Sequence, residues 1–323
     1  MIRKSGLGIA LLYAGLMVCM AGCGSVNDNP AAGEDIRSDG SIIASDSAGA
    51  ADETVDGEIT SAEENSYSAK NEQADADDAE YGDTWEGRSL SILGDSISTY
   101  EGWIPEGCAV YYPASGMLTD VSQTWWMRLL DDTGMELCSN NSSSGSTCVG
   151  DSLDVGDPKY GCSSSRISQL TGRQGTSPDL IIVYMGTNDL LIGFPVGDND
   201  GTRLVEEGVI ENFSDAYTLI LDKLESDYPA AQVYCCTLAQ VGTWGTKQPF
   251  EMYTNKLELT AEDYSKQIQV IADNKGIPVI DLYHCGIEID NLHEMTSDGV
   301  HLTPDGMECV EHAMLEAMGF AQE

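Results

Sequence analysis

Basic residues are scarce in this chain of 323 residues. Against 54 Asp and Glu there are only 15 Lys and Arg, which gives a formal net charge of −39. The shortage is not confined to one end, because residues 88–323 hold 36 acidic and 11 basic side chains. Proteins bind nucleic acid largely by neutralising its phosphates with Lys and Arg. The composition therefore excludes nucleic acid and other polyanions as partners and favours a neutral or cationic substrate.

The spacing of metal ligands is missing as well. The chain has no C-x-x-C pair and no cluster of His and Cys, so the sequence predicts no zinc site. The GDNDG run at 197–201 is acidic but lacks the full ligand register of a calcium loop. We interpret this run as a turn, and no metal is assigned to the chain.

Cysteines are present without a diagnostic pattern. Eight of them follow Cys23, an even number that permits disulfides outside the cytoplasm. Cys148 and Cys162 share one Gly- and Ser-rich region and are the pair to test first, with free buried thiols as the alternative. Cys235 and Cys236 are adjacent in an expected strand, so their side chains should point to opposite faces of a sheet.

No apolar run near the N-terminus is long enough to span a membrane comfortably. The run at 7–20 follows two basic residues and ends at Ala21-Gly22-Cys23, which predicts a signal peptide over residues 1–22. The small pair before Cys23 resembles the lipobox of bacterial lipoproteins. We therefore expect lipidation of Cys23 and an extracytoplasmic protein held at the cell membrane by that lipid anchor only. Ordinary cleavage that leaves Cys23 unmodified is the alternative.

Residues 23–87 predict no fold. Asp, Glu, Ser, Ala and Gly dominate, Arg37 and Lys70 are the only basic residues, and no apolar periodicity persists. Such a segment buries too little apolar surface to offset its chain entropy, so we expect a disordered, self-repelling tether. An acidic tail that binds calcium or a partner protein is the alternative.

Residues 88–323 alternate between strand-like and helix-like segments. Apolar runs predict strands at 89–94, 179–185, 232–238 and 278–282, and another strand begins at 136–138 and runs into a serine-rich loop. Helices are predicted at 122–130, where Ser122 is the expected cap, and at 208–224, 260–274 and 303–318. This alternation is typical of an α/β fold with a single, doubly wound parallel sheet flanked by helices. No repeat or second domain is evident.

Residues with chemical potential follow several of these strands. Ser96 follows the first strand, Gly145 the second and Asn188 the third, whereas Asp298 and His301 come after the last. In parallel sheets ligands bind beyond the carboxyl ends of the strands, so these residues should gather on one edge. Taken singly, each has an ordinary explanation as a turn, a helix cap or a loop contact. Their joint occurrence at one edge is not well explained that way.

Four blocks carry a family resemblance. GDSIS at 94–98, the loop around Gly145, GTND at 186–189 and DGVH at 298–301 resemble, in this order, the sequence blocks of the SGNH, or GDSL-like, hydrolases. The resemblance spans roughly residues 88–320. The chain lacks a G-x-S-x-G elbow, which weighs against the ordinary α/β-hydrolase arrangement.

The resemblance implies a role for each residue. Ser96 would be the nucleophile, His301 its base and Asp298 the carboxylate that orients the base. The oxyanion hole would consist of the backbone N–H groups of Ser96 and Gly145 and the side-chain amide of Asn188. Such a site requires neither a metal nor an organic cofactor.

Some neighbouring residues remain open or secondary. Gly150 is a rival to the glycine at 145 for the second backbone donor, and Asp189 is expected to orient the loop. His284, His293 and His312 are not expected to take part in catalysis.

The function we expect is a cell-surface serine esterase. Short acyl groups, acetyl above all, are favoured because no lid-like amphipathic segment occurs near the site loops. Aromatic rings that could border the site and pack against sugars are Trp103, Tyr111, Tyr112 and Trp244. An O-acetylated polysaccharide is therefore the preferred substrate, although these rings could instead fill the core beneath the loops. A lysophospholipase or lipase with the same triad and a non-catalytic glycan-binding lipoprotein are the alternatives, and the oligomeric state is open.

Overall fold

A computed structural model describes residues 85–114, 116–245 and 248–320. The predicted signal peptide, Cys23 and nearly all of the predicted tether lie outside the described residues. Within the described ranges, no helix is both long enough and apolar enough to cross a membrane. The helices and strands given below belong to one compact unit.

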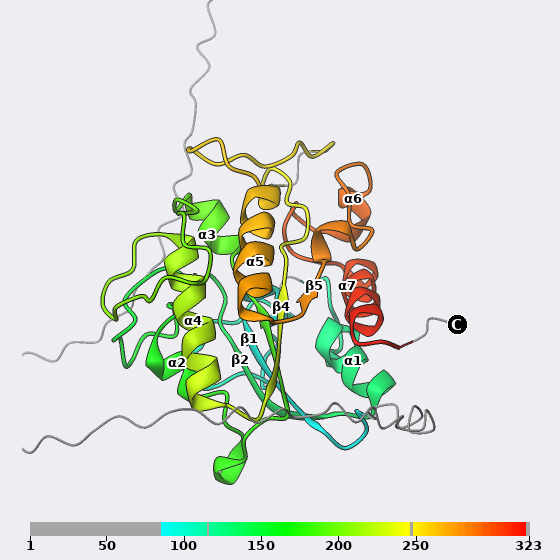
Figure 1. Ribbon diagram of the computed structural model, residues 1–323. Helices are drawn as coiled ribbons and strands as arrows, with labels where there is room; N and C mark the ends of the chain where they lie inside the picture. The colour runs from blue at the N-terminus through cyan, green and yellow to red at the C-terminus, as the bar shows by residue number, and fades with distance from the viewer. Residues whose placement is uncertain (1–84, 115, 246–247, 321–323) are drawn as a thin grey trace, which may run out of the picture. The chain divides into compact units, whose positions relative to one another are not determined.

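A single parallel sheet forms the centre of this unit (Figure 1). Its five strands follow the order β2-β1-β3-β4-β5, and every neighbouring pair is parallel. This is the flavodoxin-like order of a doubly wound sheet, so the predicted fold class is confirmed. The strands are β1 (Ser89–Gly94), β2 (Glu136–Ser142), β3 (Leu180–Tyr184), β4 (Gln232–Cys236) and β5 (Val279–Ile280).

Apolar side chains project from both faces of the sheet, and a separate hydrophobic core lies on each face. In β3, Ile181 and Val183 join one core while Leu180 and Ile182 join the other, as the alternation of a strand requires. This explains why the β3 sequence is apolar throughout. Helices packed on the first face are α2 (Ser164–Ser168), α3 (Thr187–Ile192), α4 (Phe213–Asp227) and α5 (Ala261–Lys275). Helices packed on the second face are α1 (Trp125–Thr133), α6 (Leu292–Met295) and α7 (Pro304–Ala317).

The cysteines match only part of the expectation. Cys235 and Cys236 point into opposite cores, as predicted. Cys148 and Cys162 lie beside each other, because the N–H of Cys162 donates to the carbonyl of Cys148 at 3.3 Å, but both are free thiols. Both side chains are fully buried, and that burial raises the pKa of each thiol.

The predicted boundaries differ most from the structure in three elements. Helix α1 begins at Trp125 with Thr124 as its cap, because the expected cap Ser122 lies in a preceding 3-10 turn. Strand β2 continues to Ser142 through polar residues that looked like a loop. Helix α4 begins only at Phe213, since residues just before it pair with the loop near Gly150.

The described domain also begins slightly earlier than the expected residue 88. Trp85 is buried in the core that holds α1 and α7, and the N–H of Gly87 donates to Gly134 at the end of α1. The segment that leads into β1 is therefore held against the end of α1.

Candidate active site

Ser96, His301 and Asp298 form a hydrogen-bonded relay. Ser96 begins a short 3-10 helix directly after β1, and the other two lie in the loop between α6 and α7. His301 Nε2 lies 2.9 Å from Ser96 Oγ, and His301 Nδ1 lies 2.8 Å from Asp298 Oδ2. Ser96 and His301 are 4% and 6% exposed, so little water surrounds the contact between them. The structure thus brings together three residues that are far apart in the sequence.

The Asp298 carboxylate is held in its charged form. Its Oδ1 accepts the backbone N–H groups of Val300 and His301 at 3.1 and 2.9 Å. Burial acts against the charge, but the hydrogen bonds and the nearby imidazole outweigh it and keep the pKa of Asp298 below its usual value. A charged Asp298 fixes the tautomer of the imidazole, which leaves Nε2 free to take a proton from Ser96.

Asp95 shapes the turn that presents the serine. Its Oδ1 accepts the N–H of Ile97 at 3.0 Å and caps the 3-10 helix. The side chain is fully buried, and its Oδ2 has no partner among the residues described. Burial raises the pKa of Asp95 to about 6, although the bond from Ile97 and the charges of His301 and Arg166 act in the opposite direction.

Two backbone donors near the serine have no acceptor within the described ranges. They are the N–H groups of Ser96 and Gly145. Gly145 is exposed and adopts φ +78°, a conformation that favours glycine over other residues. The Ser146 hydroxyl donates to Gly94 at 3.3 Å, which ties this loop to the end of β1. Both donors therefore border the same strand end and remain available to a ligand.

Asn188 adds a third donor from the loop after β3. Its Nδ2 donates to the carbonyl of Ser146 at 2.9 Å, which orients the amide and uses one of its two hydrogens. The other amide hydrogen is left for a further acceptor. Hydrogen bonds thus connect the ends of β1, β2 and β3 through Ser146.

Gly150, the rival to Gly145, has a packing role. A Cβ atom at this position would lie 1.9 Å from Cδ1 of Tyr160, so only glycine fits against the ring. The loop just before Gly150 is held by Asp189, whose carboxylate accepts hydrogen bonds from the N–H groups of Cys148 and Val149 at 2.8 and 3.0 Å. Burial raises the pKa of Asp189 to about 7 against the effect of these bonds. As expected from the sequence, Asp189 orients the loop.

Arg166 supports the strand ends that carry the site. This residue was not identified from the sequence. Its guanidinium is 1% exposed and donates to the carbonyls of Gly94 and Asn141 at 3.1 and 2.8 Å, as well as to that of Pro158. Burial lowers the pKa of Arg166 to about 10. It ties together the ends of β1 and β2. A single Arg among serines carries no pattern that reveals such burial.

Aromatic rings surround the imidazole. The Tyr111 ring stacks on it with 3.5 Å between centroids and 10° between planes, and Tyr112 and Trp244 approach edge-on at 6.5 and 6.3 Å. Trp103 instead packs against Trp126 at 5.7 Å. Three of the four aromatic residues expected to border the site therefore contact its histidine, but the stacking of Tyr111 was not predicted.

The remaining histidines lie elsewhere. His284 is exposed and pairs with Asp281 at 2.7 Å, while His293 and His312 lie near Glu294 and Glu311. The ion pairs described for these histidines thus involve neighbouring carboxylates and not Ser96, Asp298 or His301. Across the ranges that the structure covers, no three His, Cys, Asp or Glu side chains converge in a way that could hold a metal ion.

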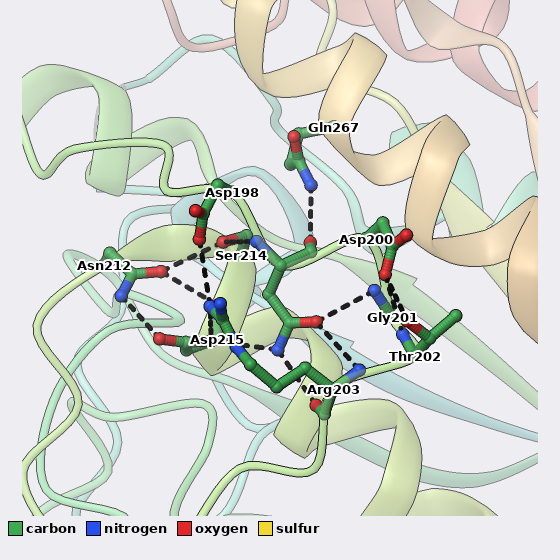
Figure 2. A network of polar contacts seen from close by, with 10 residues as sticks. Asp198, Asp200, Gly201, Thr202, Arg203, Asn212, Ser214, Asp215 and Gln267 are labelled. Carbon is green, nitrogen blue, oxygen red and sulfur yellow. Dashed lines mark hydrogen bonds and ion pairs between the residues drawn. The ribbon is translucent and has the colours of Figure 1, made fainter.

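The acidic GDNDG run forms a closed turn (Figure 2). Asn199 is 1% exposed, and its side chain bonds the backbone of Gly201 and Arg203 and the Asp215 carboxylate. Asp215 also accepts hydrogen bonds from Arg203 and Asn212 at 3.1 and 2.7 Å. Its oxygens are thus used within the network, which agrees with the interpretation of this run as a turn.

Comparisons with known proteins agree with this arrangement. A family model described as GDSL-like Lipase/Acylhydrolase matches residues 88–318. Two solved structures named as GDSL-like lipases are similar to the chain: a Bacteroides ovatus protein with 25% identity and a Bacteroides uniformis protein with 27%. Both give a TM-score of 0.52 and cover 72% of this chain, and the matches span 98% and 95% of those chains.

A third solved structure extends the likeness in fold alone. It is a protein of Lactobacillus plantarum with 19% identity and a TM-score of 0.53, covering 72% of this chain and 96% of its own. No curated protein is similar enough to this chain to serve as a relative.

Proposed function

Because the chain belongs to the GDSL-like lipase/acylhydrolase family, we propose that it is a serine esterase that removes acetyl groups from a polysaccharide. In this proposal Ser96 is the nucleophile, His301 the general base and Asp298 the orienting carboxylate. The proposed reaction needs no cofactor, since side chains and backbone N–H groups of the site take each chemical role.

The observation that carries the proposal is the relay of two short hydrogen bonds. Serine is a poor nucleophile near neutral pH unless an adjacent base takes its proton. The 2.9 Å contact from Ser96 Oγ to His301 Nε2 provides that base, and the 2.8 Å contact from Nδ1 to Asp298 orients it. The hydroxyl is thus within direct proton-transfer distance of an oriented imidazole.

Stabilisation of the oxyanion is assigned to three neutral donors. The N–H groups of Ser96 and Gly145 and the second amide hydrogen of Asn188 would receive the negative oxygen of the tetrahedral intermediate. The open position of Gly145 favours it over Gly150, whose place is taken up by packing on Tyr160. Because all three donors are uncharged, the site need not bury a charge before the substrate arrives.

The cycle has two halves. His301 takes the proton of Ser96 as the oxygen attacks the ester carbonyl, and the resulting imidazolium then protonates the leaving alcohol. The acyl group remains on Ser96. His301 next takes a proton from water, which attacks the acyl-enzyme, and the same proton returns to Ser96 as the acid departs.

A small acyl group fits the surroundings of the serine. The loop at 142–146 that borders the oxyanion donors consists of serines and one glycine, and it offers no apolar wall for a long chain. Trp244 is 64% exposed beside the imidazole and presents an aromatic surface of the kind that packs against sugars. These features favour an acetylated sugar over a lipid.

A second feature suits a polymeric substrate. A cavity of about 620 Å³ lies along the outer edge of β2 and is lined by exposed Trp103 and by polar side chains that include Asn140 and Thr171. Asn140 also donates to the carbonyl of Ser98, in the same 3-10 helix that begins with Ser96. Neighbouring sugars of a glycan could therefore follow the strand edge away from the serine.

The proposal includes the placement of the enzyme. Cys23 would carry the lipid, and residues 24–87 would hold the catalytic domain away from the membrane. A tethered enzyme of this kind suits a polymer at the cell surface, and the acidic domain suits a neutral or cationic glycan.

The test is release of acetate by the full-length protein. Acetylated xylan, mannan and peptidoglycan are incubated with the wild type and with Ser96→Ala, beside nitrophenyl esters that range from acetate to dodecanoate. We expect acetate from at least one glycan, a preference for the shortest ester, and a loss on the order of 10⁵-fold or more in Ser96→Ala.

Each other outcome has a defined meaning. Full activity in Ser96→Ala contradicts the nucleophile. A preference for long acyl chains identifies a lipase or lysophospholipase instead. Binding to a glycan without any ester hydrolysis identifies a non-catalytic binding protein.

A further inference from the structure

Tyr111 contacts both the base and the carboxylate of the relay. Its ring lies face to face with the His301 imidazole, at 3.5 Å between centroids and 10° between planes. Its hydroxyl donates to Asp298 Oδ2 at 3.2 Å, the same oxygen that accepts His301 Nδ1. One half-buried side chain therefore binds two members of the relay at once.

The backbone around Tyr111 is fixed to the nucleophile segment. Its N–H donates to Thr99 Oγ1 at 3.0 Å, and that hydroxyl in turn donates to the carbonyl of Ser96 at 2.9 Å. The next residue, Tyr112, is fully buried and donates its hydroxyl to the carbonyl of Leu302 at 3.0 Å. The position of Tyr111 is thus set by both chain segments that must meet for catalysis.

We propose that Tyr111 is a positioning residue that sets the plane of the His301 ring and adjusts the charge that the ring can carry. This inference rests on the proposed esterase function. A hydrogen bond to Asp298 alone lets the imidazole tilt about its Nδ1 contact. A parallel ring at van der Waals distance removes that tilt and keeps Nε2 directed at Ser96 Oγ.

The two contacts of Tyr111 act on the imidazolium in opposite directions. An aromatic face attracts a cation, so the ring favours the protonated imidazole that forms in the transition state. The hydroxyl is one of four donors on the Asp298 carboxylate, and it draws electron density away from the bond to Nδ1. Loss of the hydroxyl should strengthen the hydrogen bond between the Asp298 carboxylate and the imidazolium, which stabilises the cation. Loss of the ring should destabilise the cation.

Other groups that face the imidazole stay in place when Tyr111 is changed. Ser96 and Asp298 bond it directly, and the charge of the buried Asp95 acts on it from beneath. Tyr112 and Trp244 approach it edge-on. A comparison of two variants at position 111 therefore isolates the hydroxyl from the ring.

The test measures kcat and KM of the full-length protein on nitrophenyl acetate across the pH range. In Tyr111→Phe we expect kcat within about tenfold of the wild type and an acid limb of kcat/KM that moves to higher pH by about half a unit. In Tyr111→Leu we expect kcat to fall on the order of 10- to 100-fold with little change in KM, and the acid limb to lie at lower pH than in Tyr111→Phe, because the ring is lost in addition to the hydroxyl. Tyr283→Phe, whose ring lies beside His284 instead of His301, is the matched control and should leave kcat and the acid limb unchanged.

The outcomes separate this inference from the proposed function. If Ser96→Ala keeps its activity, the esterase mechanism itself fails. If Ser96→Ala is inactive but the acid limb of Tyr111→Phe coincides with that of the wild type, or the acid limbs of the two Tyr111 variants coincide with each other, Tyr111 is only a packing residue. Should Tyr111→Leu not fold, an unmoved limb in Tyr111→Phe is enough to overturn the inference.

Discussion

The network around Asn199 and the network around His301 are built from similar parts in one domain: carboxylate, amide, hydroxyl and backbone N–H groups. Around Asn199 each polar atom of that residue has a partner, including a bond from Gln267 Nε2 to its carbonyl at 2.7 Å (Figure 2). Around His301 the N–H groups of Ser96 and Gly145 have no acceptor within the described ranges. One network is complete by itself, and the other has room for a further oxygen atom.

The difference shows how to distinguish a structural network from a reactive one. A buried polar group that lacks a partner costs free energy, so a network that only supports the fold tends to be saturated. The unpaired donors near Ser96 lie at a strand end, where a ligand can complete them. Changes in the first network should therefore affect stability, and changes in the second should affect turnover.

The two carboxylates that anchor these networks give the largest contrast. Asp298 and Asp215 each accept several hydrogen bonds, and in each case these bonds outweigh burial and lower the pKa of the carboxyl. Asp298→Asn should reduce kcat by about 10⁴-fold, because the imidazole loses the partner that fixes its tautomer. Asp215→Asn should leave kcat unchanged and lower the melting temperature. Wild-type turnover in Asp298→Asn would remove this residue from the mechanism.

The two asparagines give the next contrast. Asn188→Ala should lower kcat by about 10²- to 10³-fold with a small effect on KM, because the lost donor acts on the transition state. Its stability should change little, since within the described ranges the Asn188 side chain makes a single hydrogen bond, to the carbonyl of Ser146. Asn199→Ala should keep kcat and cost about 2–3 kcal/mol of unfolding free energy, because several buried partners lose their bonds.

Kinetics and denaturant unfolding measured on the same preparations decide the matter. Asp198→Ala is the control for Asn199, since it neighbours that residue but its side chain is 88% exposed and should contribute little. The contrast fails if Asn188→Ala changes only substrate affinity, or if Asn199→Ala loses turnover while it remains folded.

Local patterns in the sequence were enough to predict much of this arrangement. Buried strands are continuous apolar runs, so β1, β3 and β4 were located, and the residues that follow them could be placed on one edge. The features that were not predicted depend on hydrogen bonds to residues far away in the sequence. Asn140 and Asn141 resemble loop residues but are buried in β2, because the backbone carbonyls of Ser98 and Arg166 accept hydrogen bonds from their side-chain amides.

The same reason explains the unpredicted parts of the site. The burial of Arg166 depends on the carbonyls of Gly94 and Asn141, which lie 72 and 25 positions away in the sequence, as well as on that of nearby Pro158. The stacking of Tyr111 on His301 joins residues that are 190 positions apart, and no spacing in either segment indicates it. Blocks with a fixed internal spacing were therefore predictable, and contacts between blocks were not.

A third carboxyl, which is more deeply buried than Asp298 and Asp215, extends the comparison because its hydrogen bonds are incomplete and no open site adjoins it within the described ranges. Glu311 in α7 is 1% exposed, and its Oε1 has no partner among the described residues. Burial first, and then the hydrogen bond and charge of Asp132 on α1, raise the pKa of Glu311 to about 7, while Arg128 acts in the opposite direction. His312 lies 3.6 Å from its Oε2, and Glu308 adds a further negative charge.

The sign of the pH dependence follows from this raised pKa. The folded state holds the proton of Glu311 more tightly than the unfolded chain, whose value is 4.5. The contribution of Glu311 to stability is fully present below that value and is lost as the pH rises through about 7. Glu311→Gln, which stays neutral, should therefore match the wild type at low pH and exceed it by on the order of 1–2 kcal/mol at about pH 8.

Chemical denaturation at both pH values measures this smallest effect, with the exposed Glu316→Gln on the same helix as the control. A single titrating group changes the unfolding free energy by at most about 1.4 kcal/mol per pH unit, so the difference should grow gradually across the window. If Glu311→Gln raised the unfolding free energy equally at low pH and at about pH 8, the charge of Glu311 would not be what destabilises the packing of α1 against α7. A gain at high pH alone would show that a carboxyl lacking a complete set of donors weakens the fold once it ionises, unlike Asp215, which is charged and fully bonded.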